Sequence, residues 1–179
     1  MTAQGRSTGA PLIRAAAPRD AVAIREIYNN YVRETIVTFE EKPVSVGEMR
    51  TRIRLIESMG LPWLVAETGG RVVGYAYANR WKERAAYRHS VETTVYLRAD
   101  CTGRGIGRVL YKHLVAELSR LGFHAIIGGI ALPNAASQRL HESMGFRKVA
   151  HFEHVGRKFD RWIDVGYWQL TLTPAAGDS

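Results

Sequence analysis

The spacing of apolar residues changes several times along the 179-residue chain, and each change marks an expected element. Apolar positions three and four residues apart predict amphipathic helices, whereas short continuous or alternating apolar runs predict strands. Helical spacing is found from Ala23 to Tyr31, from Met49 to Ile56 and from Val109 to Leu121. A fourth, shorter helix is expected around Ala136 to Met144. The predicted strands are residues 12–16, 63–67, 71–80, 91–98, 125–131, 146–155 and 162–172.

Turn and cap residues separate these elements. Ser45 and Glu48 have the spacing of a capping box, and Asn134 is placed to cap the fourth helix. Gly69 and Gly70 together predict a hairpin turn, and Gly145 predicts a helix end. We find no fixed-period repeat and no linker. We therefore expect one α+β domain over residues 10–179, with a mixed sheet of about six to seven strands, about four flanking helices and a flexible leader over residues 1–9.

Composition excludes several classes of protein. Hydrophobic residues make up 46% of the chain and charged residues 23%, which is a globular balance rather than a disordered one. Cys101 is the single cysteine, so a disulfide scaffold is excluded and a reducing, cytoplasmic location is expected. No apolar run is long enough to cross a membrane, and residues 1–20 lack the apolar core of a signal peptide.

The charge is unbalanced, with 25 Lys and Arg against 17 Asp and Glu, a formal net charge of +8. Such an excess suits nucleic acid, an acidic surface or an anionic small molecule. The basic residues are spread along the chain, and we find no helix-turn-helix or aromatic RNA-binding motif, which argues against nucleic acid. The six histidines are also scattered without a strong metal-binding spacing, so no metal site is expected.

Three glycines follow the strand predicted over residues 91–98. The segment Gly103-Arg104-Gly105-Ile106-Gly107-Arg108 leads directly into a helix. Glycine lets the backbone approach a ligand closely, and the free N–H groups of a helix's first turn attract a phosphate. The pattern lacks the third glycine of the dinucleotide fingerprint and the Gly-Lys-Ser/Thr of the P-loop. A pyrophosphate cradle and an ordinary glycine-rich turn both remain open on this evidence.

A second motif lies one helix and one strand later, in the segment Asn134-Ala135-Ala136-Ser137 to His141-Glu142-Ser143-Met144-Gly145-Phe146. Together the two motifs resemble the acetyl-CoA site of the GNAT superfamily of N-acetyltransferases. Gly105, Gly107, Asn134, Gly145 and Phe146 match that pattern. Two positions depart from it: Thr102 stands where Gln or Arg is usual, and His141 stands where many members have Tyr.

The resemblance extends over about residues 12–172, to the branch that acetylates phosphinothricin and methionine sulfoximine. It implies an acetyl-CoA-dependent N-acetyltransferase acting on the α-amine of a small anionic amino acid analogue, and a homodimer. The matching segments are Ile27-Tyr28-Asn29, Thr38-Phe39-Glu40, Trp81-Lys82-x-Arg84-x-x-Tyr87, Val91 to Leu97, and Val155 to Asp164. There are two alternatives. One is a GNAT acetyltransferase whose acceptor is an amine drug or a protein N-terminus, and the other is an acyl-CoA sensor that binds without catalysis.

The resemblance also assigns roles to residues. Glu92 matches the branch's general base, which the protonated amine needs before it can attack. Backbone N–H groups near Tyr96 and Leu97 are expected to stabilise the oxyanion, and His141 or Tyr111 to protonate the leaving thiolate. Acetyl-CoA is expected at Val95, Tyr96, Leu97, Gly103, Arg104, Gly105, Ile106, Gly107, Arg108, Asn134 and Ser143.

The amine acceptor is expected beside Glu92, at Phe39, Lys82, Arg84, Tyr87, Thr93 and Thr94. Lys82 and Arg84 carry the positive charge that a carboxylate, phosphinyl or sulfonyl group requires. A solvated basic loop is the competing interpretation of these charges. Trp162, Tyr167 and Trp168 are expected in the core or at a subunit interface.

Overall fold

The computed structural model describes residues 10–172, and the expected leader, residues 1–9, lies outside this range. Seven strands form one mixed sheet in the order β1-β2-β3-β4-β5-β7-β6. The pairs are antiparallel except β4 with β5, which is parallel. The predicted single α+β domain with a seven-stranded mixed sheet and four helices is confirmed over these residues.

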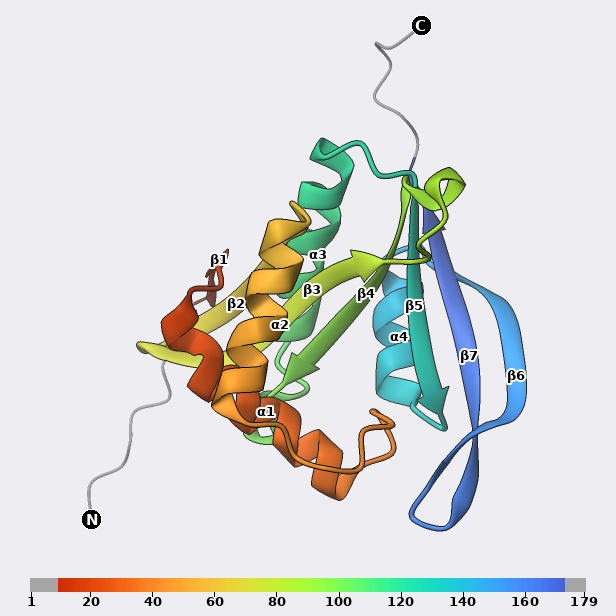
Figure 1. Ribbon diagram of the computed structural model, residues 1–179, viewed down its shortest axis with the longest axis horizontal. Helices are drawn as coiled ribbons and strands as arrows, with labels where there is room; N and C mark the ends of the chain where they lie inside the picture. The colour runs from red at the N-terminus through yellow and green to blue at the C-terminus, as the bar shows by residue number, and fades with distance from the viewer. Residues whose placement is uncertain (1–9, 173–179) are drawn as a thin grey trace, which may run out of the picture.

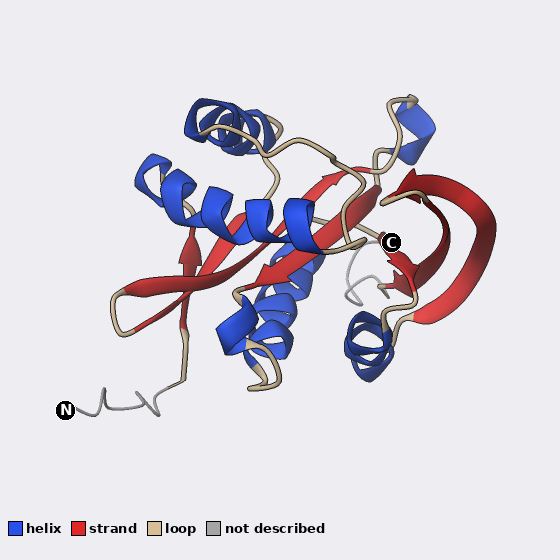
Figure 2. Cartoon of the chain, turned by 90° about the horizontal axis from the view of Figure 1, so that it is seen from below, coloured by secondary structure: helices blue, strands red, loops and turns tan. Residues whose placement is uncertain are grey.

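The strands are β1 (Leu12–Ala15), β2 (Trp63–Thr68), β3 (Arg71–Arg80), β4 (Ser90–Leu97), β5 (Ala125–Leu132), β6 (Arg147–Lys158) and β7 (Arg161–Thr171). The helices are α1 (Ala21–Glu34), α2 (Val46–Ser58), α3 (Ile106–Arg120) and α4 (Ala135–Ser143). Figure 2 shows α1 and α2 on one face of the sheet, and α3 and α4 on the other. None of the helices in this range is long and apolar enough to cross a membrane.

The predicted caps are present. The Ser45 hydroxyl accepts a hydrogen bond from the Glu48 backbone N–H at 3.1 Å, and the Glu48 carboxylate accepts one from the Ser45 N–H at 2.8 Å. The Asn134 side chain accepts from the Ser137 N–H at 3.1 Å. These bonds satisfy backbone donors that a helix leaves free at its first turn.

The core lies between the sheet and the two pairs of helices. Ile24, Met49, Leu110, Leu114 and Leu118 are at most 1% exposed and come from the inner faces that the apolar spacing predicts. Burying each such side chain contributes about 1.5–3 kcal/mol. This packing fixes α3 against β2, β3 and β4 and so places the start of α3 beside the end of β4.

Two irregular features shape the far side of the sheet. Residues 35–45 connect α1 to α2 without a helix or strand, and we refer to them as the 35–45 segment. The β6–β7 hairpin turns through Phe159 and Asp160, which both have positive φ (50° and 56°) as a two-residue type I′ turn requires. Between Phe152 and Gly156 the β6–β7 register shifts, and the Asp164 carboxylate accepts the His154 N–H there at 2.9 Å.

Candidate active site

The centre of the sheet is split. Strands β4 and β5 pair only at Ser90 with Ala125, Val91 with Ile126 and Glu92 with Ile127. Beyond these pairs the two strands diverge, as Figure 1 shows. The later residues of β4 therefore face an opening instead of a neighbouring strand, and backbone groups on that side are free to contact a ligand.

A groove of about 530 Å³ runs from this opening across the start of α3. Gly103 and Gly105 have φ of 72° and 76°, the left-handed region that side chains other than glycine rarely adopt. At Gly107 a Cβ would lie 3.3 Å from the Leu97 side chain, which is a tight contact. The first-turn N–H groups of α3 and the Arg108 side chain beside them suit a pyrophosphate.

A smaller cavity of about 80 Å³ lies between the diverging strands and joins the groove at Val95, Asn134 and Ser137. Its walls also include Thr93 on β4 and His141 on α4. This volume suits a group as small as an acetyl. The groove and the cavity therefore have the shape that an acyl-CoA needs, with the acyl end between β4 and β5.

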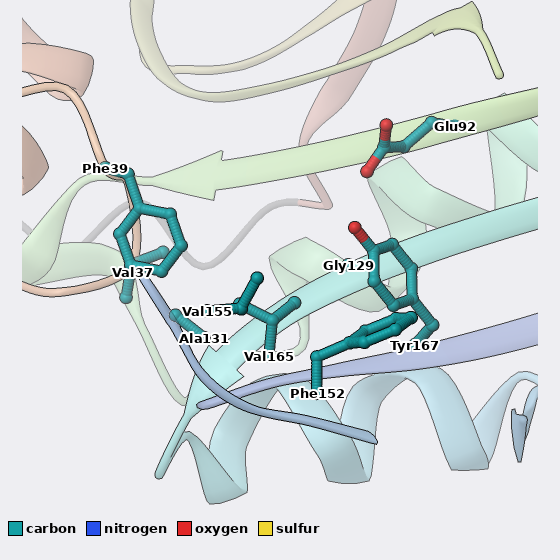
Figure 3. Close-up of a pocket in the computed structure, with 9 residues that line it drawn as sticks. All are labelled: Val37, Phe39, Glu92, Gly129, Ala131, Phe152, Val155, Val165 and Tyr167. Atoms are coloured by element: carbon teal, nitrogen blue, oxygen red, sulfur yellow. The ribbon is translucent and has the colours of Figure 1, made fainter. Parts of the chain in front are cut away.

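On the other side of the split lies a pocket of about 500 Å³, drawn in Figure 3, which we call the acceptor pocket. It meets the small cavity at Gly129 and Ala131, and Val37 lines the groove, the cavity and the pocket alike. The acceptor pocket is lined by Val37, Phe39, Glu92, Gly129, Ala131, Phe152, Val155, Val165 and Tyr167. Of these residues, Glu92 alone carries a charge. The three spaces therefore adjoin one another along the split, and we refer to them together as the path through the split sheet.

Glu92 lines the acceptor pocket near Gly129, which also lines the small cavity. Figure 3 shows its carboxyl group pointing into the acceptor pocket on the side of Tyr167. A Cβ placed on Gly129 would lie 3.1 Å from Glu92 Oε1 and 3.2 Å from the Tyr167 ring, so only glycine leaves room there. Burial raises the pKa of Glu92, and the positive charge of Lys82 opposes the rise. A carboxylate with a raised pKa is a stronger base than a solvent-exposed one.

Tyr111 and His141 form a buried hydrogen-bonded chain behind the small cavity. His141 Nδ1 lies 2.8 Å from the Ser137 carbonyl oxygen, which can only accept, so this nitrogen carries the proton. Burial lowers the pKa of His141 and favours the neutral ring, whose Nε2 then accepts from the Tyr111 hydroxyl at 3.1 Å. Thr93 Oγ1 lies 2.5 Å from the Tyr111 hydroxyl oxygen and 3.3 Å from the Ile127 carbonyl oxygen. Burial also raises the pKa of Tyr111 well above its usual range.

The structure brings most of the predicted site residues together. Val95, Leu97, Gly103, Gly105, Gly107, Arg108, Asn134 and Ser143 line the groove. Tyr96, Thr93, Thr94 and His141 line the small cavity, and Phe39 and Glu92 line the acceptor pocket. Tyr111 is fully buried beside the cavity.

Other predicted residues lie apart from the three spaces. Arg104 is exposed, and the Ile106 side chain is buried in the core. Lys82, Arg84 and Tyr87 are exposed on the loop before β4. The Lys82 ammonium lies 4.8 Å from the Trp81 ring, and Trp81 packs edge-on against Tyr167 of the acceptor pocket. Lys82 therefore lies near the rim of the pocket and not within it.

Sequence reasoning missed the walls of the acceptor pocket on β5, β6 and β7. Tyr167 was expected in the core or at an interface, yet it lines the pocket together with Phe152 and Val165. Gly129 was read only as part of a buried strand. No spacing in the sequence marks these residues, because pairing between distant strands, such as Gly129 with Tyr167, brings them together.

Comparison with known proteins agrees with this geometry. A family model described as an acetyltransferase (GNAT) domain matches residues 13–166. The L-methionine sulfoximine/L-methionine sulfone acetyltransferase of Salmonella typhimurium is 39% identical over 160 residues, covering 89% of this chain and 94% of the relative. The phosphinothricin N-acetyltransferase of Streptomyces viridochromogenes is 38% identical over 157 residues, covering 88% of this chain and 85% of the relative.

A solved structure shows the same arrangement with a ligand. The GNAT superfamily phosphinothricin acetyltransferase from Sinorhizobium meliloti, in complex with acetyl-CoA, superposes with a TM-score of 0.89 at 35% sequence identity. The match covers 94% of this chain and 95% of that one.

Proposed function

Because the chain belongs to the GNAT family and is an N-acetyltransferase that uses acetyl-CoA, we propose an amino acid analogue as its acceptor. The proposed reaction is acetylation of the α-amine of phosphinothricin, methionine sulfoximine or methionine sulfone. The observation that carries the proposal is the path through the split sheet. The groove and small cavity accept the donor from one side, the acceptor pocket opens on the other, and Glu92 stands between them.

The acceptor pocket supports an amino acid whose side chain ends in an apolar group. Phe39 and Val155 form an apolar wall at one end, and the Glu92 carboxyl lies at the other (Figure 3). An ammonium group placed near Glu92 would direct a methyl-ended side chain toward Phe39. Lys82 and Arg84, on the exposed loop near the rim, supply the positive charge for the acceptor's anionic groups. Phosphinothricin, methionine sulfoximine and methionine sulfone all combine these features.

In this proposal Glu92 removes a proton from the acceptor ammonium, and the free amine attacks the thioester carbonyl. Backbone N–H groups of β4 near Tyr96 and Leu97 stabilise the oxyanion, because β4 has no paired neighbour on the β5 side there. The CoA thiolate takes up one proton as it leaves, and the proposed donor is His141, in the wall of the small cavity, or Tyr111 behind it. The group that gives the proton regains one from the reacting amine or from solvent, because burial favours the neutral form of both side chains.

The experiment is a thiol-release assay with acetyl-CoA over a panel of acceptors. We expect turnover with phosphinothricin, methionine sulfoximine or methionine sulfone, and much weaker turnover with an aminoglycoside or a peptide that carries a free N-terminus. Turnover with only the aminoglycoside or only the peptide would show that this N-acetyltransferase uses a different amine acceptor from the one proposed. Glutamate, which lacks the terminal methyl group, tests the apolar wall and is expected to be a poor substrate.

We also propose that the enzyme is a homodimer formed by the β6–β7 hairpin. Val149, Phe152, Val155, Phe159 and Trp162 are all more than half exposed on this hairpin, and β6 is an edge strand of the sheet. Such an apolar edge is normally covered in a stable protein. Sedimentation should give a dimer for the wild type and a monomer for Trp162→Asp. A monomeric wild type would exclude this assembly.

A further inference from the structure

A lysine is buried at the end of β6. Lys158 is 3% exposed, and its Nζ donates a hydrogen bond at 2.8 Å to the backbone carbonyl of Thr38, far away in the sequence. Its ammonium also lies 5.1 Å from the centre of the Phe159 ring. Burial lowers the pKa of Lys158, while the charges of Glu41 and Glu40 oppose that change. Lysine is rarely buried without a compensating partner, because removing an ammonium from water is costly.

The Thr38 carbonyl that accepts from Lys158 lies in the 35–45 segment. Two other side-chain contacts hold the same segment in place. The Tyr28 hydroxyl and Thr38 Oγ1 lie 2.8 Å apart. Arg52 on α2 donates two hydrogen bonds to the Glu40 carboxylate, at 2.7 and 3.2 Å. Tyr28 and Arg52 belong to the helical layer, whereas Lys158 belongs to the hairpin on the far side of the split. Lys158 therefore ties the 35–45 segment to the opposite wall of the acceptor pocket.

Phe39 lies between Thr38 and Glu40, and its ring rests on the backbone of Gly156. A Cβ built on Gly156 would lie 2.5, 2.6 and 2.9 Å from three atoms of that ring, so no other residue fits without displacing it. Gly156 is two residues before Lys158 on the same strand. The hairpin thus supplies both Gly156, on which the Phe39 ring packs, and Lys158, which donates a hydrogen bond to the Thr38 carbonyl.

We propose that Lys158 is a positioning residue that sets acceptor affinity, by holding the Thr38 carbonyl so that the Phe39 ring closes the apolar end of the acceptor pocket. This inference rests on the proposed function for the identity of the pocket. Lys158 does not line the pocket, and its effect passes through Thr38 and Phe39. Loss of the ammonium frees Thr38 and Phe39 on the acceptor side, whereas the 35–45 segment contributes only Val37 to the acetyl-CoA groove.

The first test is Lys158→Met, which keeps the length and apolar body of the side chain and removes the donor. We expect the acceptor KM to rise by about tenfold, kcat to change by less than about threefold and the acetyl-CoA KM to stay constant. Lys158→Arg, which retains a cationic donor, should recover part of the acceptor affinity. The matched control is Arg157→Met, because Arg157 is exposed on the same strand and contacts Asp160 and the Trp162 ring of its own hairpin instead of the 35–45 segment.

The second test reaches the same contact without changing charge. Gly156→Ala displaces the Phe39 ring and should raise the acceptor KM as Lys158→Met does, and the double variant should show less than the sum of the two effects. Two results would overturn the positioning role. The first is a fall in kcat as large as the rise in acceptor KM in both Lys158→Met and Gly156→Ala. The second is an unchanged acceptor KM in Lys158→Met that is correctly folded.

Hydrogen exchange separates this inference from the proposed function, because it needs no acceptor. In Lys158→Met, amide exchange should accelerate within residues 37–41 and stay unchanged in α3 and β4. Faster exchange throughout the protein would show a merely structural role and overturn the inference. If the wild type acetylates none of the three analogues, the proposed acceptor fails, whereas the exchange result still decides whether Lys158 holds the segment.

Discussion

As the proposed base, Glu92 has to satisfy two opposing requirements with one carboxyl group. A base must be ionised to accept a proton, yet burial favours its neutral form and raises its pKa. Lys82 at the rim limits this rise, because its positive charge stabilises the ionised form. The result is a carboxylate that is more basic than a glutamate on the surface, with a nearby positive charge that favours its ionised form. Removing either the burial or the nearby charge would shift that balance.

Replacing Glu92 by Gln keeps the shape of the side chain and removes the base. We expect kcat to fall by about 100-fold or more, with acetyl-CoA binding unchanged in calorimetry, because Glu92 lines the acceptor pocket and not the donor groove. Glu83→Gln, on the exposed loop nearby, serves as the control and should have wild-type turnover. Wild-type turnover by Glu92→Gln would remove Glu92 from the base role.

The same substitution should increase stability at neutral pH. The folded-state pKa of Glu92 is raised, so the ionised carboxyl costs stability above that pKa, and the cost disappears as the pH falls through it. Gln carries no charge and avoids the cost. Thermal unfolding at pH 7.5 should therefore give a higher midpoint for Glu92→Gln than for the wild type, and the difference should vanish at acidic pH. A lower midpoint at pH 7.5 would contradict the sign of the pKa shift.

At the scale of elements, the sequence predicts what local chemistry decides. Ser45, Glu48 and Asn134 cap their helices as their spacing indicates, and Gly69 and Gly70 form the turn between β2 and β3. The divergence of β4 from β5 has no comparable local signal. It depends on which residues of two distant strands pair, and it brings Gly129 and the β7 residues to the acceptor pocket. The register shift between Phe152 and Gly156 of β6, the stretch that includes the pocket residue Val155, has no local sequence signal either.

The capping box of α2 offers a test at this scale. Ser45→Ala removes the hydroxyl that accepts the Glu48 N–H and should lower the free energy of unfolding by about 1 kcal/mol. Urea denaturation measures the change. Ser58→Ala at the other end of α2 is the matched control, since its exposed hydroxyl bonds only to a carbonyl one turn back, and we expect a much smaller effect. Equal losses for both variants would show that the cap contributes nothing specific.

At the scale of the whole molecule, the net charge of +8 becomes informative only once it is placed in the structure. Arg108 lines the groove that accepts acetyl-CoA, and the cationic residues Lys82 and Arg84 lie on the loop near the acceptor pocket. Acetyl-CoA is anionic and each proposed acceptor carries a carboxylate, so part of the positive charge favours the binding of these groups. Arg104 is exposed between Gly103 and Gly105 of the groove and adds to the positive charge there.

Salt should therefore weaken donor binding. Raising sodium chloride from about 50 mM to about 500 mM should increase the acetyl-CoA KM several-fold with little change in kcat, because salt screens the approach of the phosphates. Arg108→Gln should raise this KM at low salt and flatten its salt dependence. An unchanged salt dependence in Arg108→Gln would show that the attraction comes from the field of the whole surface and not from this residue.

The groove and the acceptor pocket are built largely by different segments. The groove draws on α1, the end of β4, the start of α3 and α4, while the acceptor pocket draws mainly on β5, β6 and β7, with Glu92 of β4 and Phe39 of the 35–45 segment. Among the described residues, Val37 lines both spaces. Substitutions in the β6–β7 hairpin and the 35–45 segment can consequently change which amine acceptor binds. The residues of the acetyl-CoA groove can stay the same. Selection for a new acceptor would then change residues mainly on one side of the protein.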